Sequence, residues 1–169
     1  MKKCILLILS IFIFNINSAF AEIISRQDQF TNKMVYVSST SQRTPNPITN
    51  EKYNAYWFEK CGVGNDATYS FKIWLTSYSE FSFKDIPIEI KIDDLPVITV
   101  PVKNTWKNKF AINEGNKLFL EAVLPFDVVN KIKTASRVAI RCFRTESDFV
   151  LIFTDDRLNE WKTVINIGE

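Results

Sequence analysis

Carboxylate pairs are the side chains of this sequence that could act together as an acid and a base, because the chain contains no histidine. Such chemistry needs one carboxyl group to donate a proton and a second to accept one or to attack. Glu59 with Asp66 and Asp155 with Asp156 are two such pairs, and their spacing singles out neither. The missing histidine also removes Ser-His-Asp and Cys-His nucleophiles and His-bearing zinc sites. We therefore expect no enzymatic activity.

Two adjacent aspartates, Asp93 and Asp94, precede Leu95 and Pro96. A cation site is one interpretation, but Ca²⁺ and Mg²⁺ require six or more oxygen ligands or a dedicated loop. Aspartate is also among the residues that turns favour, so a turn between two strands is the better explanation. We expect neither a metal nor another cofactor.

Residues 1–21 have the composition of a secretory signal peptide. Lys2 and Lys3 give a positive start, an apolar run follows from Ile5 to Ile16, and 19–21 form a small-x-small cleavage signal. We predict cleavage before Glu22 and no membrane span afterwards, because the apolar run is shorter than the ~20 residues that a span requires. A retained anchor is the alternative. The protein would then be periplasmic or secreted.

The predicted mature chain, residues 22–169, is long enough for a single domain. Loss of Lys2 and Lys3 leaves 19 basic and 19 acidic residues, so this domain is formally neutral. Proteins that grip nucleic acid carry a basic excess that contacts phosphates. We therefore expect no nucleic acid partner.

Two cysteines, Cys61 and Cys142, remain after loss of the signal segment that holds Cys4. Disulfides form and persist in export compartments. We therefore predict a disulfide between Cys61 and Cys142, with two buried free thiols as the alternative.

Alternation of apolar and polar residues predicts an all-β domain. The clearest strand is 86–93, which has isoleucine at every second position, and Val138, Ile140 and Cys142 share the core face of a strand within 136–144. In the segment 53–61 we place Trp57 and Cys61 on the core face. Further strands are predicted at 33–39, 67–77, 97–102, 117–124 and 149–154, the last of them as a buried strand.

The other segments are predicted as loops or helices. We expect residues 22–30 to form an irregular segment at the start of the mature chain, 40–50 a loop and 103–116 a polar connection. Helical spacing appears in 125–133 and after Asp155, where Leu158, Trp161, Val164 and Ile165 form one stripe. The expected fold is an antiparallel β-sandwich of about eight strands, with one inter-sheet disulfide and one or two short capping helices.

Two tryptophans form a candidate contact surface with nearby lysines. Trp74 lies on the polar side of its strand, and Lys103 and Lys107 flank Trp106. Exposed aromatic residues are typical of binding faces, and basic residues around an aromatic ring can stack on single-stranded nucleic acid or a glycan. Packing of Trp74 under a loop, and a solvated loop around Trp106, are the structural alternatives.

The motif Trp57-Phe-Glu-Lys-Cys61 is followed by a strand ending in Asp93, a helix within 124–133, a strand within 138–143, and a last strand and helix. In this motif and this order of elements the mature chain resembles the exported invasion-associated locus B family of bacterial proteins. This chain lacks the family's second early cysteine and its Gly-Cys pair. The resemblance implies an exported accessory or virulence-associated protein without known catalysis, and it transfers no site residues.

These observations lead to a non-catalytic binding or accessory protein of the bacterial cell envelope, with a role in virulence or secretion, that acts by contact with another protein. An inhibitor of an extracellular hydrolase, with residues 40–50 as its probe, is an alternative. A structural subunit of a surface fibre is another, because such subunits share the size and the sandwich.

Overall fold

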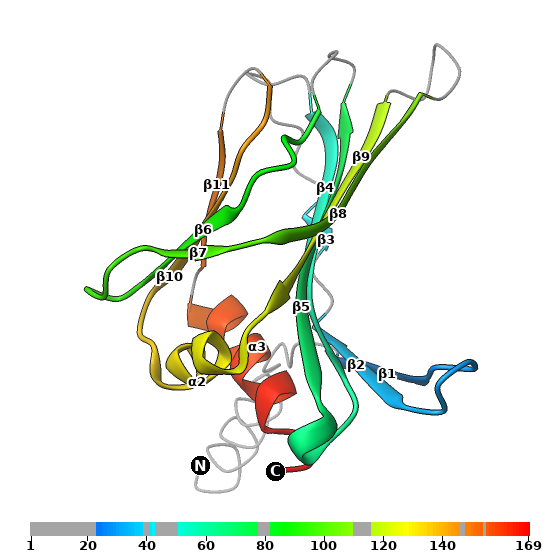
Figure 1. Ribbon diagram of the computed structural model, residues 1–169, viewed down its shortest axis with the longest axis vertical. Coiled ribbons are helices and arrows are strands. Elements are labelled where there is room, and N and C mark those ends of the chain that lie inside the picture. The colour runs from blue at the N-terminus through cyan, green and yellow to red at the C-terminus, as the bar shows by residue number, and fades with distance from the viewer. Residues whose placement is uncertain are drawn as a thin grey trace, which may run out of the picture.

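The computed structural model describes residues 23–38, 41–42, 51–77, 82–109, 116–145, 148–153 and 155–169. The predicted signal segment lies outside these residues. Within them the chain is mostly β, with two antiparallel sheets and two α-helices (Figure 1), as the sequence predicts. No helix in this part of the chain is long and apolar enough to cross a membrane.

The elements follow one another along the chain as β1 (Ile23–Gln27), β2 (Met34–Ser38), β3 (Ser41–Gln42), β4 (Glu51–Cys61), the 3-10 turn η1 (Gly64–Asp66), β5 (Thr68–Ser77), β6 (Ile88–Ile92), β7 (Ile98–Val100), β8 (Val102–Lys109), β9 (Asn116–Leu124), α2 (Phe126–Thr134), β10 (Val138–Cys142), β11 (Phe149–Ile152) and α3 (Asp155–Asn166).

Among the described residues the larger sheet has seven strands, in the order β1-β2-β4-β5-β9-β8, with β3 paired to β4. Its central strand β5 alternates as predicted, because every second residue from Tyr69 to Leu75 is buried on the inner face. Strand β9 does the same with every second residue from Leu118 to Leu124. The alternation places the intervening side chains of both strands on the outer face of the sheet.

The smaller sheet has four strands in the part of the chain that the structure describes, in the order β11-β10-β6-β7, and faces the inner side of the larger sheet (Figure 1). Its inner face carries the alternating isoleucines of β6 and the predicted core residues of β10, which are Val138, Ile140 and Cys142. Ile140 lies directly opposite Ile90 in the register of the two strands. The predicted core faces of both strands are confirmed, except at Ile86.

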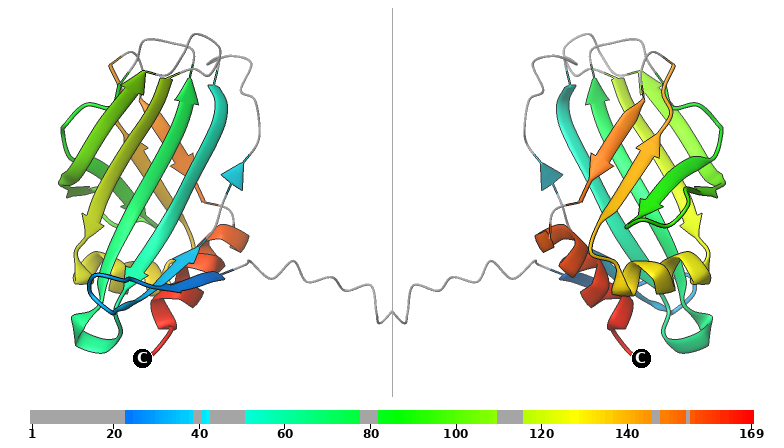
Figure 2. Two further views of the ribbon diagram at one scale, coloured as in Figure 1. Left: turned by 90° about the vertical axis from the view of Figure 1, so that its right-hand side faces the viewer. Right: turned by 90° about the vertical axis from the view of Figure 1, so that its left-hand side faces the viewer.

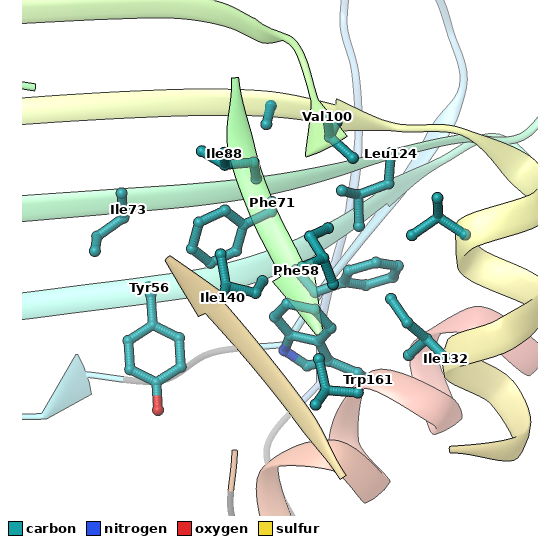
Figure 3. Close-up of a cluster of buried hydrophobic side chains, with 14 of the residues drawn as sticks. Tyr56, Phe58, Phe71, Ile73, Ile88, Val100, Leu124, Ile132, Ile140 and Trp161 are labelled. Atoms are coloured by element: carbon teal, nitrogen blue, oxygen red, sulfur yellow. The ribbon is translucent and has the colours of Figure 1, made fainter. Parts of the chain in front are cut away.

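A single apolar cluster joins the two sheets and the two helices (Figure 3). Trp161 of α3 lies within it, fully buried, with its ring centroid 4.8 Å from that of Phe58 and 4.4 Å from that of Phe153. The ring centroid of Phe71, in the central strand, lies 6.0 Å from that of Trp161. Buried aromatic rings of this size dominate core energetics, so Trp161 fastens α3 to the sheets.

Both helices form where the sequence predicts them, at one end of the sheets (Figure 1). Pro125 precedes α2, where its fixed φ and missing N–H suit the start of a helix. The predicted stripe of α3 is buried along its whole length, including Leu158, Val164 and Ile165.

Three segments that the sequence predicts as loops contain strands instead, namely β1, β3 and β8. Strand β8 pairs with β9 from Val102 to Lys109. This pairing joins β8 to the next strand of the chain as a hairpin, and polar side chains are compatible with an edge strand that has one face in solvent. Of the predicted loop 40–50, the residues other than Ser41–Gln42 lie outside the described part of the chain.

Two apolar segments are less buried than the sequence predicts. Ile86 is 43% exposed and precedes β6 rather than belonging to it. Strand β11 lies at the border of the smaller sheet, so that Val150 and Ile152 point outward and are 51% and 78% exposed. The prediction of a buried strand was wrong here because the smaller sheet packs on the core with one face only, so that alternate residues of β11 lie on its outer face.

The predicted disulfide is absent, since Cys61 and Cys142 are both free thiols. Cys142 lies in the core, but Tyr56, Phe58 and Lys60 are the buried residues at the end of β4. Trp57 and Cys61 therefore occupy the opposite, outer face of the larger sheet. A strand that presents its other set of side chains to the core directs the thiol of Cys61 away from Cys142.

Candidate functional site

Aromatic side chains form one row across the outer face of the larger sheet. In the strand register, Trp74 of β5 lies opposite Phe119 of β9, and Phe119 lies opposite Trp106 of β8. Directly opposed residues in antiparallel strands point to the same face. The sheet therefore brings together three rings from three strands.

Trp57, Trp74, Trp106 and Phe119 together are called the aromatic strip. The rings of Trp74 and Trp106 meet edge to face, with centroids 5.4 Å apart, although the strand of Phe119 separates them. Phe119 stacks on Trp106 at 5.6 Å and lies 6.4 Å from Trp57 of β4. Trp106 is 37% exposed. The strip thus forms a continuous ridge of rings held in place by one another.

A cluster of alternating charges borders the aromatic strip on the same face. Its centre is the amino group of Lys72, which lies 2.7 Å from Oε1 of Glu59 and 3.7 Å from Oε1 of Glu121. Lys103 approaches the same Glu121 oxygen at 3.5 Å, and Arg26 lies 4.0 Å from Glu59. We call these five residues the ion cluster. Each acidic group has two basic neighbours.

The three central members of the ion cluster are largely shielded from solvent. The side chains of Glu59, Lys72 and Glu121 are only 13%, 17% and 14% exposed. A bulge in β8, where Val102 pairs with Ala122 but Asn104 with Glu121, brings Lys103 to the same face. Charged side chains that are paired and shielded from solvent in this way give a binding surface a fixed pattern of electrostatic potential.

The structure assembles three of the four side chains in the predicted contact surface. Trp74, Trp106 and Lys103 lie on one face of the larger sheet. Lys107 does not join them, because it pairs with the buried Leu118 and therefore points to the other side of β8. Alternation along β8 separates Lys107 from its sequence neighbour Trp106.

Sequence reasoning missed six contributors to this surface, namely Trp57 and Phe119 of the aromatic strip and Arg26, Glu59, Lys72 and Glu121 of the ion cluster. Phe119 and Glu121 could have been predicted from the sequence, because the alternation of β9 already places them on the face away from the core. Trp57 could not, since we assigned it to the core together with Cys61. The residues at 56–61 are large or polar on both faces of β4, so periodicity alone does not choose between the faces.

The members of the candidate acid and base pairs lie at exposed positions or in an ion pair. Glu59 is held by Lys72 in the ion cluster, whereas Asp66 is an exposed residue of η1. Asp155 and Asp156 are exposed in the first turn of α3. Among the described residues, no group of three or more Asp, Glu or Cys side chains could hold a metal ion.

Asp93 has a structural part in the predicted turn between β6 and β7. Its carboxylate accepts hydrogen bonds from the backbone N–H groups of Ser136, at 3.0 Å, and Arg137, at 2.7 Å. Its φ of 44° lies in the left-handed region, which aspartate tolerates better than most residues. The turn explanation of Asp93 and Asp94 is thereby supported, and the carboxylate joins the turn to the start of β10.

Comparisons with known proteins identify no family for this chain. No family model and no curated protein sequence matches it. A search of solved structures finds the crystal structure of invasion associated protein b from Bartonella henselae, with 11% sequence identity and a TM-score of 0.34. The match covers 85% of this chain and 94% of that chain. It is a weak structural resemblance.

Proposed function

We propose that this protein is a non-catalytic, exported binding module of the bacterial cell envelope that contacts another protein through the outer face of its larger sheet. The observation that carries the proposal is the aromatic strip, in which the rings of Trp74 and Trp106 meet at 5.4 Å on a face without covering strands in the described part of the chain. A role accessory to virulence or secretion is part of this proposal.

The composition of the surface supports protein contact. Tryptophan contributes more binding energy at protein interfaces than most residues, because a large rigid ring buries much apolar area at a low entropic cost. The strip places three tryptophans and a phenylalanine side by side. A partner that covers them would desolvate a ridge already ordered by its own ring contacts.

The ion cluster supplies the polar border that interfaces commonly have around an apolar centre. Lys103 and Arg26 are its exposed members, with 61% and 68% of their side chains accessible, and Glu121 holds Lys103 at 3.5 Å. Complementary charges on a partner would fix the orientation in which it docks.

The scaffold in this proposal is an antiparallel β-sandwich. The single apolar cluster shared by both sheets supports that interpretation. Such a scaffold holds one sheet face rigidly toward solvent while the other face forms the core.

Site-specific photo-crosslinking in a bacterial host tests the proposed contact. A photoreactive phenylalanine analogue in place of Lys103 should give a discrete adduct with a second protein, and Trp106→Ala in the same chain should reduce its yield at least tenfold. The same analogue at Asn130, which is exposed on α2, should give no such adduct. Phe126→Ala is the matched control, because Phe126 is a 59% exposed aromatic residue away from the strip.

Equal adduct yields from the parent chain and the Trp106→Ala variant would contradict the proposed surface. The fold of each variant is checked by its unfolding temperature before the yields are compared.

Export is tested separately by the mature N-terminus. Mass spectrometry of the protein recovered from the periplasm or medium should find a chain that begins at Glu22. A protein recovered from the cytoplasm with residues 1–21 attached would contradict export.

A further inference from the structure

Strand β11 presents a bare edge of the smaller sheet. In the described part of the chain it pairs with β10 only, and Figure 2 shows it in orange along the border of that sheet. Val150 and Ile152 are exposed beside this edge, at 51% and 78%. An edge strand with unpaired backbone groups and apolar side chains is a template for a further strand.

The hydrogen bonds of β10 show which backbone groups are free. The N–H of Phe153 donates to the carbonyl oxygen of Val138 at 3.0 Å, and Ile140 pairs with Leu151. Alternate residues of an antiparallel pair exchange hydrogen bonds, so Leu151 and Phe153 direct their backbone groups to β10. Val150 and Ile152 therefore direct theirs to the open edge.

The other sheet edges carry features that discourage strand addition. Strand β8 contains Lys103, Lys107 and Lys109, and β1 contains Arg26. Strand β7 has three residues, between Pro96 and Pro101. Charged residues, prolines and short length are the usual protections of an edge. By contrast, Phe149-Val-Leu-Ile152 has no charge, proline or glycine.

The occupant follows from the symmetry of the sequence around Leu151. Residues 149–153 read Phe-Val-Leu-Ile-Phe, so a β-branched aliphatic residue lies on each side of Leu151 and a phenylalanine lies at each end. We propose that β11 pairs with β11 of a second copy of this chain, antiparallel, about a two-fold axis at Leu151. This inference is independent of the proposed function.

This register satisfies the backbone and the side chains together. Val150 lies opposite Ile152 of the second copy, and both are residues whose N–H and C=O groups point to the open edge, so each such pair exchanges two hydrogen bonds. The exposed side chains of Val150 and Ile152 then shield each other on one face. Leu151 lies opposite its own copy at a position without hydrogen bonds.

A register moved by two residues loses this match. With the axis at Val150, Ile152 would lie opposite Asp148, which sets an apolar side chain against a carboxylate. A strand of four residues per chain makes an interface smaller than the standard of about 1,600 Å². We therefore expect a weak dimer, formed at roughly 0.1–1 mM.

Cysteine crosslinking tests both the pairing and its register. The parent variant carries Cys4→Ser and Cys61→Ser, whereas Cys142 is retained because it is buried. Leu151→Cys should give a disulfide-linked dimer on oxidation, since opposed residues without hydrogen bonds have Cα atoms about 4.5 Å apart, within the disulfide range. Val150→Cys or Ile152→Cys alone should give at least tenfold less dimer, and a mixture of the two should crosslink.

Sedimentation without crosslinking gives the second readout. The unmodified chain should show concentration-dependent dimer, and Ile152→Lys should weaken association at least tenfold. Ile24→Lys, at a 46% exposed position of β1, is the matched control and should leave it unchanged. A dimer linked through Val150→Cys alone would overturn the register, and a monomer at every concentration without any crosslink would overturn the pairing itself.

Discussion

The amino group of Lys60 donates a hydrogen bond of 2.7 Å to the backbone carbonyl oxygen of Ile165, at the end of α3. A second bond of 2.7 Å goes to the carbonyl oxygen of Ile167. The last carbonyl groups of a helix lack partners within the helix and favour a nearby cation. Lys60 is fully buried, and this burial lowers its pKa. A buried lysine of β4 thereby caps the C-terminal end of the last helix.

Replacement of that lysine should destabilise the fold. Lys60→Met keeps the side-chain length but leaves two carbonyl groups without their donor, so we expect a loss of about 2–4 kcal/mol in the free energy of unfolding, measured by urea titration. Lys131→Met removes a 42% exposed lysine that pairs with Asp127 and should change it by less than about 0.5 kcal/mol. Equal effects of the two substitutions would show that Lys60 does not hold the helix end.

Truncation of Trp161 to alanine should lower the free energy of unfolding more than replacement of Trp161 by another aromatic residue. Trp161→Ala leaves a cavity between Phe58 and Phe153, and we expect a loss of about 3–5 kcal/mol. The indole N–H has no hydrogen-bond partner among the described residues, so Trp161→Phe removes a buried donor without such a partner and should cost about 1–2 kcal/mol of stability. Thermal and urea unfolding measure both. Similar losses for the two variants would contradict a core role for the ring.

The pair of Lys72 and Glu59 should show a measurable coupling. A double-mutant cycle with Lys72→Met and Glu59→Gln should give about 0.5–1 kcal/mol, because both side chains are less than one-fifth exposed. The coupling between Arg137 and Asp94, which are 75% and 99% exposed, should be near zero in the matched cycle. Coupling of equal size in both cycles would contradict a shielded ion cluster.

Alkaline pH should weaken the fold through buried acids. Burial raises the pKa of the Cys142 thiol to about 12 from an ordinary value of 9.0, and it also raises the pKa of Tyr56. An acid with a raised folded pKa binds its proton longer in the folded state, so the stability it contributes below pH 9 is lost as the pH rises toward 12. Lys60, with its lowered pKa, contributes a slope of opposite sign below its ordinary value of 10.5.

The contribution of Cys142 is isolated by comparison with Cys142→Val. Urea midpoints between pH 8 and 11 should fall less steeply for this variant than for the parent chain. Parallel pH profiles would show that the thiol ionises equally in both states.

The sequence by itself determined the elements whose two faces differ chemically. In β5, β6, β9 and β10 one face is apolar and the other is not, so alternation identified both the strand and its orientation. The stripe of α3 was equally clear, because four apolar residues recur at helical spacing. Burial of apolar area is the driving force in each of these elements, and it can be read from the residue types in order.

Only the tertiary structure decided the orientation of β4 and the existence of β8. At the end of β4, both sets of alternating residues contain aromatic and charged side chains. The set that contains Lys60 faces the core because the C-terminal end of α3 gives the amino group of Lys60 two carbonyl oxygens as acceptors. These acceptors lie more than one hundred residues away in the sequence. With Lys60 inward, Trp57 and Cys61 point outward, which creates part of the aromatic strip and prevents the disulfide.

Strand β8 likewise owes its form to hydrogen bonds with β9 rather than to its own polar residues. Trp106 joined Trp74 for the same reason, because sheet register is a property of paired strands and not of either strand alone. Composition and periodicity are local, whereas the pairing that assembles the candidate site is not.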